Sequence, residues 1–469
     1  SLHGSLALKK QKANHNRLHS KQFYLIIMKI ASKLIRLSAI TLSLTSLAMA
    51  ADSKPNIIVI MADDVGHECF GAYGSEQYQT PNIDRLAQIG IQFNLGYSQP
   101  VCTPSRVKIM TGKSNVHNYV NFACLDSNER TFGHILKDAG YATCIAGKWQ
   151  LAQLPRKLKP GQNPGTLPAD AGFDEHYMWQ VQDRGNRYWK PTLTFNGKTK
   201  TYGADDYGPQ LLSEKVLEFI ERKKDQPFFV YYPMVLVHSP FPTTPLSEDK
   251  NSKDNQKNFE DMIFYMDHLI GDLVNKLEAL KIRDNTLILF LADNGTHGSL
   301  RSQFRGNTVK GAKGNTIDYG IHVPFIANWT GVTAPQQNQD LIHIGDILPT
   351  ITELAGVAIP EDVTGKSFAP LLTGTPYEPR EFMYMYYNSR PLEASKKKIK
   401  VFAQSKTWKL YTNGKLYHYA EDILEKAPFL ENQEPERAST MRKKLQQVLD
   451  QYPAEGVMIE KPFTKTKTV

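Results

Sequence analysis

Cysteine is scarce in this sequence: Cys69, Cys102, Cys124 and Cys144 are the only four in a chain of 469 residues. Such a low content excludes a small scaffold held together by disulfides. Internal repeats and low-complexity tracts are also missing after residue 50. The fold must therefore be stabilised by hydrophobic cores, and residues 51–469 are long enough for one large domain and one smaller one.

Acidic side chains are absent from the first fifty residues, which carry eight Lys and Arg. Met28 opens a basic stretch, which is followed by an apolar run over residues 37–47 and by Ala48-Met49-Ala50. This order is typical of a secretory signal peptide, and the apolar run is too short to span a bilayer. We expect residues 28–50 to direct export to the periplasm or the extracellular medium, and residues 1–27 to be upstream sequence outside the fold.

A large excess of one charge is missing from the rest of the chain. The full sequence has a formal net charge of +9, and subtracting the eight basic residues before residue 51 leaves about +1. A nucleic-acid partner requires a large basic face, so we expect none. A local basic cluster, Lys396-Lys397-Lys398-Ile399-Lys400, is either a solvated loop or a surface that attracts an anionic polymer.

Four near-continuous apolar runs are typical of strands buried on both faces of a sheet. They cover residues 56–62, 142–147, 228–237 and 286–292. Helical patterns lie between them, over residues 81–89, 211–223 and 259–280. This alternation predicts an α/β fold, with a large, mostly parallel (mixed) sheet sandwiched by helices.

Each apolar run ends in charged or titratable side chains, at the edge where sites form in parallel sheets. These groups are Asp63-Asp64, Lys148, His238 and Asp293-Asn294. Three carboxylates close together repel one another, so we expect a cation among them. Oxygen ligands favour Ca²⁺ or Mg²⁺ over zinc, which prefers His and Cys.

The run Cys102-Thr103-Pro104-Ser105-Arg106 is predicted to begin a helix, because proline suits the first turn and residues 107–111 can continue it. The free amides of a helix N-terminus attract anions, and Arg106 lies one turn after Cys102 on the same face. Lys148 and Lys313 would add positive charge for a tetrahedral anion. The arrangement favours an oxyanion ester as substrate over a neutral molecule.

Residues 102–112 resemble the signature C-x-P-S-R-x-x-x-[LM]-T-G of the formylglycine-dependent (type I) sulfatases of the alkaline phosphatase superfamily. The resemblance extends over residues 51–469. It implies an alkaline-phosphatase-like catalytic domain over residues 51–375. It also implies a small C-terminal subdomain over residues 376–469, with an antiparallel sheet and a helix, whose hairpin resembles residues 408–410 and 414–417.

This resemblance implies that a maturase oxidises Cys102 to formylglycine, whose hydrate attacks the sulfur of a sulfate ester. Three cysteines would then remain, so at most one disulfide could form. The family's metal ligands, usually for calcium, fall on Asp63, Asp64, Asp293 and Asn294, and the modified Cys102 completes the site. In the same pattern Arg106 stabilises the nucleophile, Lys148 and Lys313 neutralise the sulfate oxygens, and His238 protonates the departing oxygen.

One position departs from the family's pattern. Gln150, in Gly147-Lys148-Trp149-Gln150, stands where the family usually has a histidine that contacts the nucleophile. Glutamine can hold a hydrogen bond but cannot carry a proton at neutral pH. Either the chain is a subfamily variant that finds its base elsewhere, with His297 and His322 as candidates, or turnover is impaired. We favour the first reading, because every other matched position is intact.

The segment over residues 179–189, W-Q-V-Q-D-R-G-N-R-Y-W, mixes aromatic side chains with two arginines. Aromatic faces stack on sugar rings, and arginines pair with sulfate or carboxylate. We therefore expect a loop that binds a sulfated carbohydrate, with a purely structural aromatic cluster as the equal alternative. The candidate substrate contacts are Trp179, Arg184 and Arg187 of this segment, together with His297 and His322 from later in the chain.

Three other functions stay open. The superfamily core also serves phosphate esters, so the chain could be a phosphodiesterase or a phosphonate monoester hydrolase. It could be a non-catalytic relative that binds sulfated glycans and has lost turnover through Gln150. It could also hydrolyse small aryl sulfates, with no sugar in the substrate.

Overall fold

The computed structural model describes residues 54–153, 163–181, 184–391, 399–431 and 433–452. The chain divides into two units, Ser1–Lys54 and Pro55–Val469, and all described residues except Lys54 belong to the second. The expected export signal and the lysines 396–398 lie outside the described residues. The boundary expected at residue 375 falls inside the second unit and stays a prediction.

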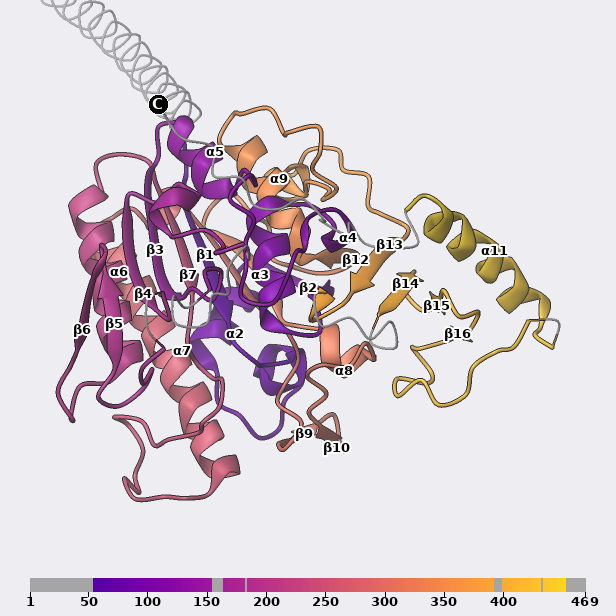
Figure 1. The fold of residues 1–469 in the computed structure, drawn as a ribbon, viewed down its shortest axis with the longest axis horizontal. Helices are drawn as coiled ribbons and strands as arrows, with labels where there is room; N and C mark the ends of the chain where they lie inside the picture. The colour runs from indigo at the N-terminus through magenta and orange to yellow at the C-terminus, as the bar shows by residue number, and fades with distance from the viewer. Residues whose placement is uncertain (1–53, 154–162, 182–183, 392–398, 432, 453–469) are drawn as a thin grey trace, which may run out of the picture. The chain divides into compact units, whose positions relative to one another are not determined.

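The second unit is built on a ten-stranded sheet with the strand order β12-β2-β11-β8-β1-β7-β3-β4-β5-β6 (Figure 1). The adjacent strands β8, β1, β7, β3 and β4 run parallel to one another, and β12 runs parallel to β2. The other pairs, made by β11, β5 and β6, are antiparallel, so the expected mixed, mostly parallel sheet is confirmed. The strands are β1 (Asn56–Ala62), β2 (Ile91–Tyr97), β3 (Ala142–Lys148), β4 (Glu175–Trp179), β5 (Thr192–Phe195), β6 (Lys198–Thr201), β7 (Phe228–Pro233), β8 (Thr286–Ala292), β11 (Phe325–Trp329) and β12 (Gln336–His343).

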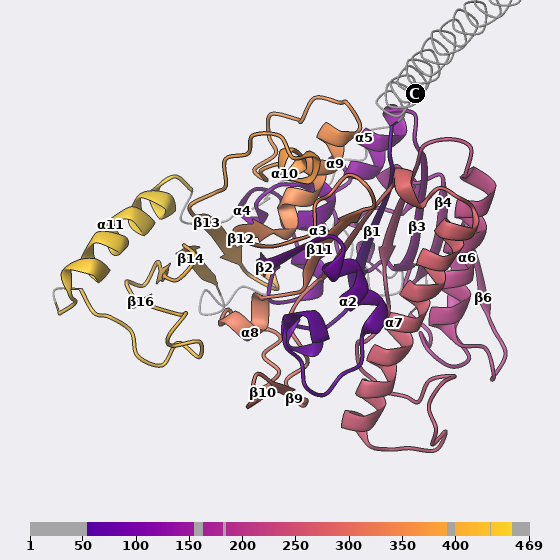
Figure 2. The ribbon, with the colours of Figure 1, turned by 180° about the vertical axis from the view of Figure 1, so that it is seen from behind.

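Helices cover both faces of this sheet because its central strands are apolar on both sides. Alternate residues of β1 enter two separate hydrophobic clusters, Ile58 and Ile60 on one face and Ile57 and Val59 on the other. The first cluster includes side chains of α2 (Pro81–Gln88), α6 (Gly208–Lys223) and α7 (Asn255–Ala279), which lie toward the viewer in Figure 2. The second includes those of α3 (Cys102–Thr111), α5 (Phe132–Asp138) and α9 (Ile347–Leu354).

One expected strand is shorter than its apolar run. The run over residues 228–237 reads as one strand, but β7 ends at Pro233. The chain then follows the loop after β1, where Asp63 N donates to Leu236 O at 2.8 Å and Val237 N donates to Asp63 O at 2.8 Å. The last four apolar residues of the run are therefore buried in a loop, which places His238 beyond the sheet edge.

A small four-stranded antiparallel sheet follows, made of β13 (Met383–Tyr387), β14 (Lys400–Gln404), β15 (Lys409–Tyr411) and β16 (Leu416–Tyr417). Its two faces have different partners, as the alternation in β13 shows. Met383 and Met385 pack with Tyr97 and Leu341 of the large sheet. Tyr384 and Tyr386 share a cluster with α11 (Glu436–Asp450), so the expected small antiparallel sheet with a helix is confirmed (Figure 1).

The remaining elements are short. They are the hairpin β9 (Arg301–Phe304) and β10 (Asn307–Lys310), the helices α4 (Asn115–Asn118), α8 (Asp318–Ile321) and α10 (Ala369–Thr373), and the 3-10 turns η1 (His67–Cys69), η2 (Gly71–Tyr73), η4 (Ala169–Ala171), η5 (Arg283–Asn285) and η6 (Ile344–Asp346). Among the described residues, no helix combines the length and apolarity that crossing a membrane requires. All four cysteines fall in the described ranges, and each is buried and unpaired.

Candidate active site

Four oxygen-bearing side chains meet where β1 and β8 end side by side. Asp64 N donates to Asp293 Oδ1 at 3.1 Å, and Asn294 Nδ2 donates to Asp64 Oδ1 at 2.9 Å. Together with Asp63, all are fully buried. The Asn294 Oδ1 atom has no hydrogen-bond partner among the described residues. An uncommitted amide oxygen beside three carboxylates fits a hard cation such as Ca²⁺ or Mg²⁺.

Basic side chains surround these carboxylates. Lys148 Nζ donates to both oxygens of Asp63, at 2.9 and 2.8 Å, and Lys313 Nζ donates to Asp64 Oδ2 at 2.5 Å. An Arg106 guanidinium nitrogen lies 3.0 Å from Asp293 Oδ2. The same side chain donates to the backbone oxygen of Lys148 at 3.0 Å. The site therefore holds buried charge of both signs, which is suited to an anionic substrate and a cation together.

The electrostatic balance differs among the three carboxylates. Burial alone would raise the pKa of Asp63, but the charges of Lys148, His238 and Arg106 outweigh it and hold the pKa well below its usual range. For Asp64, burial is likewise outweighed, chiefly by Lys313, and its pKa is lowered. Burial and the charge of Asp63 raise the pKa of Asp293 to about 7, against the opposing charge of Arg106. A cation beside Asp293 would favour its ionised form.

Cys102 is the first residue of α3, and its side chain is buried. Ser105 fixes this helix start, because its Oγ donates to the backbone oxygen of Asp293 at 2.5 Å. Gly314 N donates to Pro100 O at 2.8 Å, which brings the segment of Lys313 to the same place. Both Lys313 and Arg106 interact electrostatically with Cys102. The expected helix start is confirmed, and Cys102 lies among the basic groups of the site.

The position of Lys148, at the end of β3, depends on the glycine that precedes it. Gly147 has φ +128°, and a Cβ there would lie 1.9 Å from the backbone oxygen of Pro233 at the end of β7. A larger residue would therefore force β3 and β7 apart. This close approach allows Lys148, only 1% exposed as a side chain, to reach Asp63.

His238 lies at the rim of the same cluster. Its Nε2 is 3.4 Å from Asp64 Oδ2, and its Nδ1 is 2.6 Å from the backbone oxygen of Ser239. Because a carbonyl oxygen only accepts, Nδ1 carries the proton of the neutral ring, and Nε2 is the atom that gains or loses one. Burial lowers the pKa of His238 to about 4, although Asp64 and Asp63 oppose this.

Gln150 follows Lys148 by two residues and has a left-handed backbone, with φ 55°. Its side chain is buried, and among the described residues Oε1 has no hydrogen-bond partner. The neighbouring Trp149 is anchored, since its N donates to Trp179 O at 3.1 Å and its Nε1 to Thr166 O at 2.8 Å. A fixed backbone and an uncommitted amide oxygen suit a hydrogen bond to a bound group.

The aromatic segment after β4 lines a cavity of about 270 Å³, shared with Pro240 beyond His238. The Arg187 guanidinium lies 3.9 Å above the Trp179 ring and 3.8 Å from Asp63 Oδ2, so it joins this cavity to the carboxylates. Arg184 also lines the cavity. Trp189 is tied down by a hydrogen bond from Nε1 to Thr243 O at 2.7 Å. Residues 182 and 183 of this segment lie outside the described residues.

Comparison with known proteins places this site in a family. A family model described as Sulfatase matches residues 55–357, which is well over half of the chain. The chain belongs to the sulfatase family. It is therefore a type I sulfatase of the alkaline phosphatase superfamily and a sulfuric ester hydrolase. A second model, described as N-sulphoglucosamine sulphohydrolase, C-terminal, matches residues 313–452.

Individual relatives support the same assignment. Arylsulfatase A of Bos taurus is 30% identical over 384 residues, which cover 74% of this chain and 73% of that protein. An N-acetylgalactosamine-6-O-sulfatase of Bacteroides thetaiotaomicron is 28% identical over 410 residues, which cover 70% and 78%. A structure described as a complex with its substrate D-glucosamine-2-N,6-O-disulfate has a TM-score of 0.69 at 21% identity, over 85% of this chain and 97% of that one. This last likeness shows the fold.

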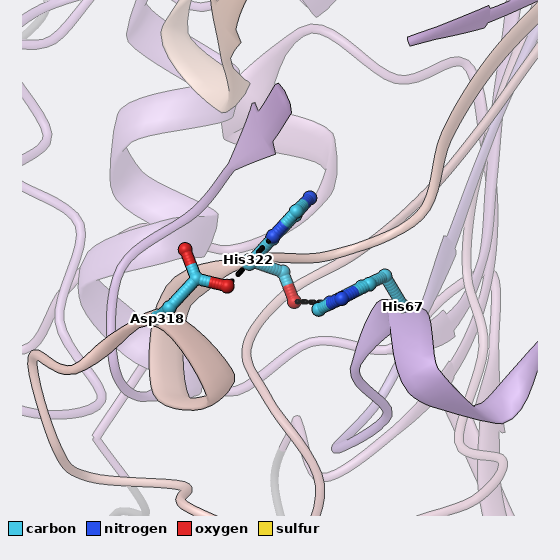
Figure 3. A group of neighbouring side chains, drawn as sticks. All are labelled: His67, Asp318 and His322. Atoms are coloured by element: carbon cyan, nitrogen blue, oxygen red, sulfur yellow. Dashed lines mark hydrogen bonds and ion pairs between the residues drawn. The ribbon is translucent and has the colours of Figure 1, made fainter. Parts of the chain in front are cut away.

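In this sulfatase, the His322 side chain is buried and lies beside Asp318 and His67 (Figure 3). Its Nδ1 lies 2.9 Å from Asp318 Oδ2, its Nε2 lies 3.0 Å from Asn94 O, and its ring stacks on His67 at 3.7 Å between centroids. His67, Asp318 and His322 are close enough to hold a metal ion. Both nitrogens of His322 already face acceptors, so the three residues form a hydrogen-bonded cluster, and a role of His322 as a substrate contact or base stays a prediction.

The other candidate histidine is less constrained. His297 is partly exposed, with Nδ1 2.8 Å from Ser299 Oγ and its ring edge-on to Phe241 at 5.8 Å between centroids. It stays a candidate substrate contact of the sulfatase.

Two positioning contacts were not predicted from the sequence. The Tyr188 hydroxyl donates to the backbone oxygens of His238 and Val235, which fixes the loop that carries His238. Tyr387 of β13 interacts electrostatically with Cys102 and Lys313. Neither contact has a local sequence signal, because each joins segments far apart in the chain.

Proposed function

We propose that this sulfatase removes a sulfate ester from a sulfated carbohydrate, with a nucleophile derived from Cys102 and with a divalent cation, calcium or magnesium. The observation that carries the proposal is the meeting of Cys102, at the start of α3, with three carboxylates, Lys148 and Lys313 at one sheet edge. Sulfate transfer needs this combination of nucleophile, cation site and anion-neutralising lysines.

The chain's residues divide into those that hold the groups and those that act on the ester. Asp63, Asp64, Asp293 and Asn294 would hold the cation together with the modified Cys102. When present, the cation supplies Lewis acidity and the formylglycine supplies the attacking oxygen. Arg106, fixed against Asp293 at 3.0 Å, orients the nucleophile.

Two lysines and one histidine would act on the sulfate itself. Lys148 and Lys313 are held in place by Asp63 and Asp64, and their ammonium groups neutralise charge that builds on the sulfate oxygens. His238 presents Nε2 toward this cluster beside Asp64, whose charge favours a proton on that nitrogen, and in this protonated form it delivers the proton to the departing sugar oxygen. Gln150 would accept a hydrogen bond from the bound nucleophile but cannot move a proton. The chain is therefore a subfamily variant whose base lies elsewhere.

The sugar would bind in the cavity lined by Trp179, Arg184 and Arg187. This cavity lies beside His238, the residue expected to face the leaving group, because Pro240 forms part of its wall. Arg187 reaches from the cavity to Asp63, so a bound sugar and its sulfate would contact the same guanidinium. Sulfated-sugar names and ligands among the relatives favour the same substrate class.

The proposal also covers the export of the protein and its maturation after translation. Export from the cytoplasm is supported by the apolar segment before residue 51 and by the Ala48-Met49-Ala50 that ends it. The enzyme would then meet polysaccharides that are degraded in the periplasm or the extracellular medium. A maturase that recognises residues 102–112 would generate formylglycine before the enzyme can act.

The test is sulfate release from a panel of esters. We expect release from glucosamine-2-N,6-O-disulfate or N-acetylgalactosamine 6-sulfate, and weaker turnover of 4-nitrocatechol sulfate. Lys148→Ala should abolish release, while the exposed Lys198→Ala is the matched control that leaves it intact. Preferential cleavage of bis(4-nitrophenyl) phosphate or a phenyl phosphonate would favour the phosphoesterase alternative. Cation-dependent binding of the sugars without sulfate release would favour a glycan-binding protein.

A further inference from the structure

A second cavity, of about 460 Å³, lies between the segment after Lys313 and the small sheet. Its walls include residues 314–317, Tyr387 of β13, Lys400 of β14, and Lys415 and Tyr417 around the β15–β16 hairpin. This cavity is separate from the one beside His238, with which it shares no lining residue.

The second cavity adjoins the segment that leads into the helix of Cys102. Gly314, in its wall, directly follows Lys313 and is hydrogen-bonded to Pro100, two residues before Cys102. Tyr387, in the opposite element, interacts electrostatically with both Cys102 and Lys313. A substrate whose sulfate contacts Lys313 can therefore extend into this cavity.

The cavity carries uncompensated positive charge. Its acidic residue, Glu425, is already paired, because Lys409 Nζ and the Tyr411 hydroxyl each donate to it at 2.6 Å. Lys400 and Lys415 are exposed, and within the described ranges neither ammonium group has a hydrogen bond or an ion pair. Lys400 and Lys415 therefore have no carboxylate partner within the described part of the chain, and two such ammonium groups attract an anionic group of the substrate.

We propose that this cavity binds a second anionic group, a sulfate or a carboxylate, on a sugar next to the one that is desulfated. The inference rests on the proposed function and narrows its substrate class. The enzyme would act on an oligosaccharide or polysaccharide that carries at least two negative groups, rather than on a singly sulfated monosaccharide or a small aryl sulfate.

The test measures binding directly, so that it does not depend on turnover. Isothermal titration uses the full-length Cys102→Ala protein as background, and three tetrasaccharides as probes: heparin, chondroitin 6-sulfate and unsulfated chondroitin. The unsulfated probe carries carboxylates only and separates the two kinds of anion. We expect Lys400→Ala and Lys415→Ala each to weaken binding of at least one probe about three- to tenfold, and the pair together more strongly. Lys443→Ala, an exposed lysine of α11, is the matched control.

A second readout separates this role from general damage to the protein. The ratio of kcat/KM for a tetrasaccharide to that for 4-nitrocatechol sulfate should fall in Lys400→Ala and Lys415→Ala, mainly through KM. Sodium chloride raised from 50 to 300 mM should weaken tetrasaccharide binding more in the background protein than in the double variant.

The two proposals fail in different ways. Absence of sulfate release from every ester, with lysine-dependent tetrasaccharide binding intact, contradicts the proposed catalysis and leaves the cavity assignment standing. Equal binding by the background protein and the double lysine variant overturns the cavity assignment, even if sulfate is released. Failure of all three tetrasaccharides to bind the background protein overturns it as well.

Discussion

Replacing Glu68 with glutamine should change how the stability of the protein depends on pH. Glu68 lies in η1, fully buried, with Thr296 Oγ1 donating to its Oε1 at 2.6 Å. Its Oε2 has no hydrogen-bond partner among the described residues. Burial raises the pKa of Glu68 to about 7, against an ordinary value of 4.5, although the Thr296 hydrogen bond opposes this.

The sign of the effect follows from where the proton is bound. Between pH 4.5 and 7 the folded protein keeps the Glu68 proton while the unfolded chain loses it, so the free energy of unfolding falls as pH rises. The full difference is on the order of 3 kcal/mol, since each pKa unit is worth about 1.4 kcal/mol. Glu68→Gln has no proton to lose, so it should match the parent protein near pH 4.5 and exceed its stability above pH 7.

The assay is urea unfolding at pH 5, 6, 7 and 8 for the parent protein and Glu68→Gln. The exposed Glu361→Gln is the control, which should track the parent at every pH. The reasoning is refuted if Glu68→Gln and the parent keep a constant difference in unfolding free energy over this range. That outcome would mean that Glu68 is ionised in the folded protein at pH 5.

Three further predictions concern the cation, the leaving group and the small sheet. Asn294→Ala removes an amide oxygen that has no hydrogen-bond partner among the described residues, so it should weaken calcium binding tenfold or more. The readout is a smaller rise in Tm on calcium addition, and the exposed Asn251→Ala should leave that rise unchanged. His238→Ala should lower kcat about a hundredfold or more for sugar sulfates but far less for 4-nitrocatechol sulfate, because the nitrocatechol oxygen leaves without a proton. Equal losses of kcat for both substrates would contradict the role of His238 as general acid. Arg442→Ala should lower the free energy of unfolding by about 3 kcal/mol, because the Arg442 guanidinium donates hydrogen bonds to Glu434 and to the backbone oxygens of Gly414 and Phe429. A loss below about 1 kcal/mol in urea unfolding would show that this network does not stabilise the fold.

The sequence was sufficient to predict the sheet and most of its edge. Strands buried on both faces read as continuous apolar runs, and β1 and β8 match residues 56–62 and 286–292. The polar groups that follow such runs must leave the sheet at its edge, so Asp63 and Asp293 could be placed together before the fold was known. The helix start at Cys102 was predictable because proline and the following residues have strong local preferences.

Features set by tertiary pairing could not be read from the sequence. The end of β7 was missed, because residues 234–237 are as apolar as the strand and leave the sheet only to bond the loop of Asp63. Arg187 was expected to contact a sugar, but nothing local indicates that it also reaches Asp63. Likewise, the cavity beside Lys313 forms only when the small sheet packs against the large one.

The central claim is that Cys102 is the source of the nucleophile, and mass spectrometry tests it most directly. The tryptic peptide over residues 86–106, taken from protein made in its native host, contains this residue. Conversion of Cys102 to formylglycine lightens the peptide by roughly 18 Da, and the account predicts that the lighter form dominates. A peptide with an intact, unmodified cysteine in enzyme that releases sulfate would contradict it.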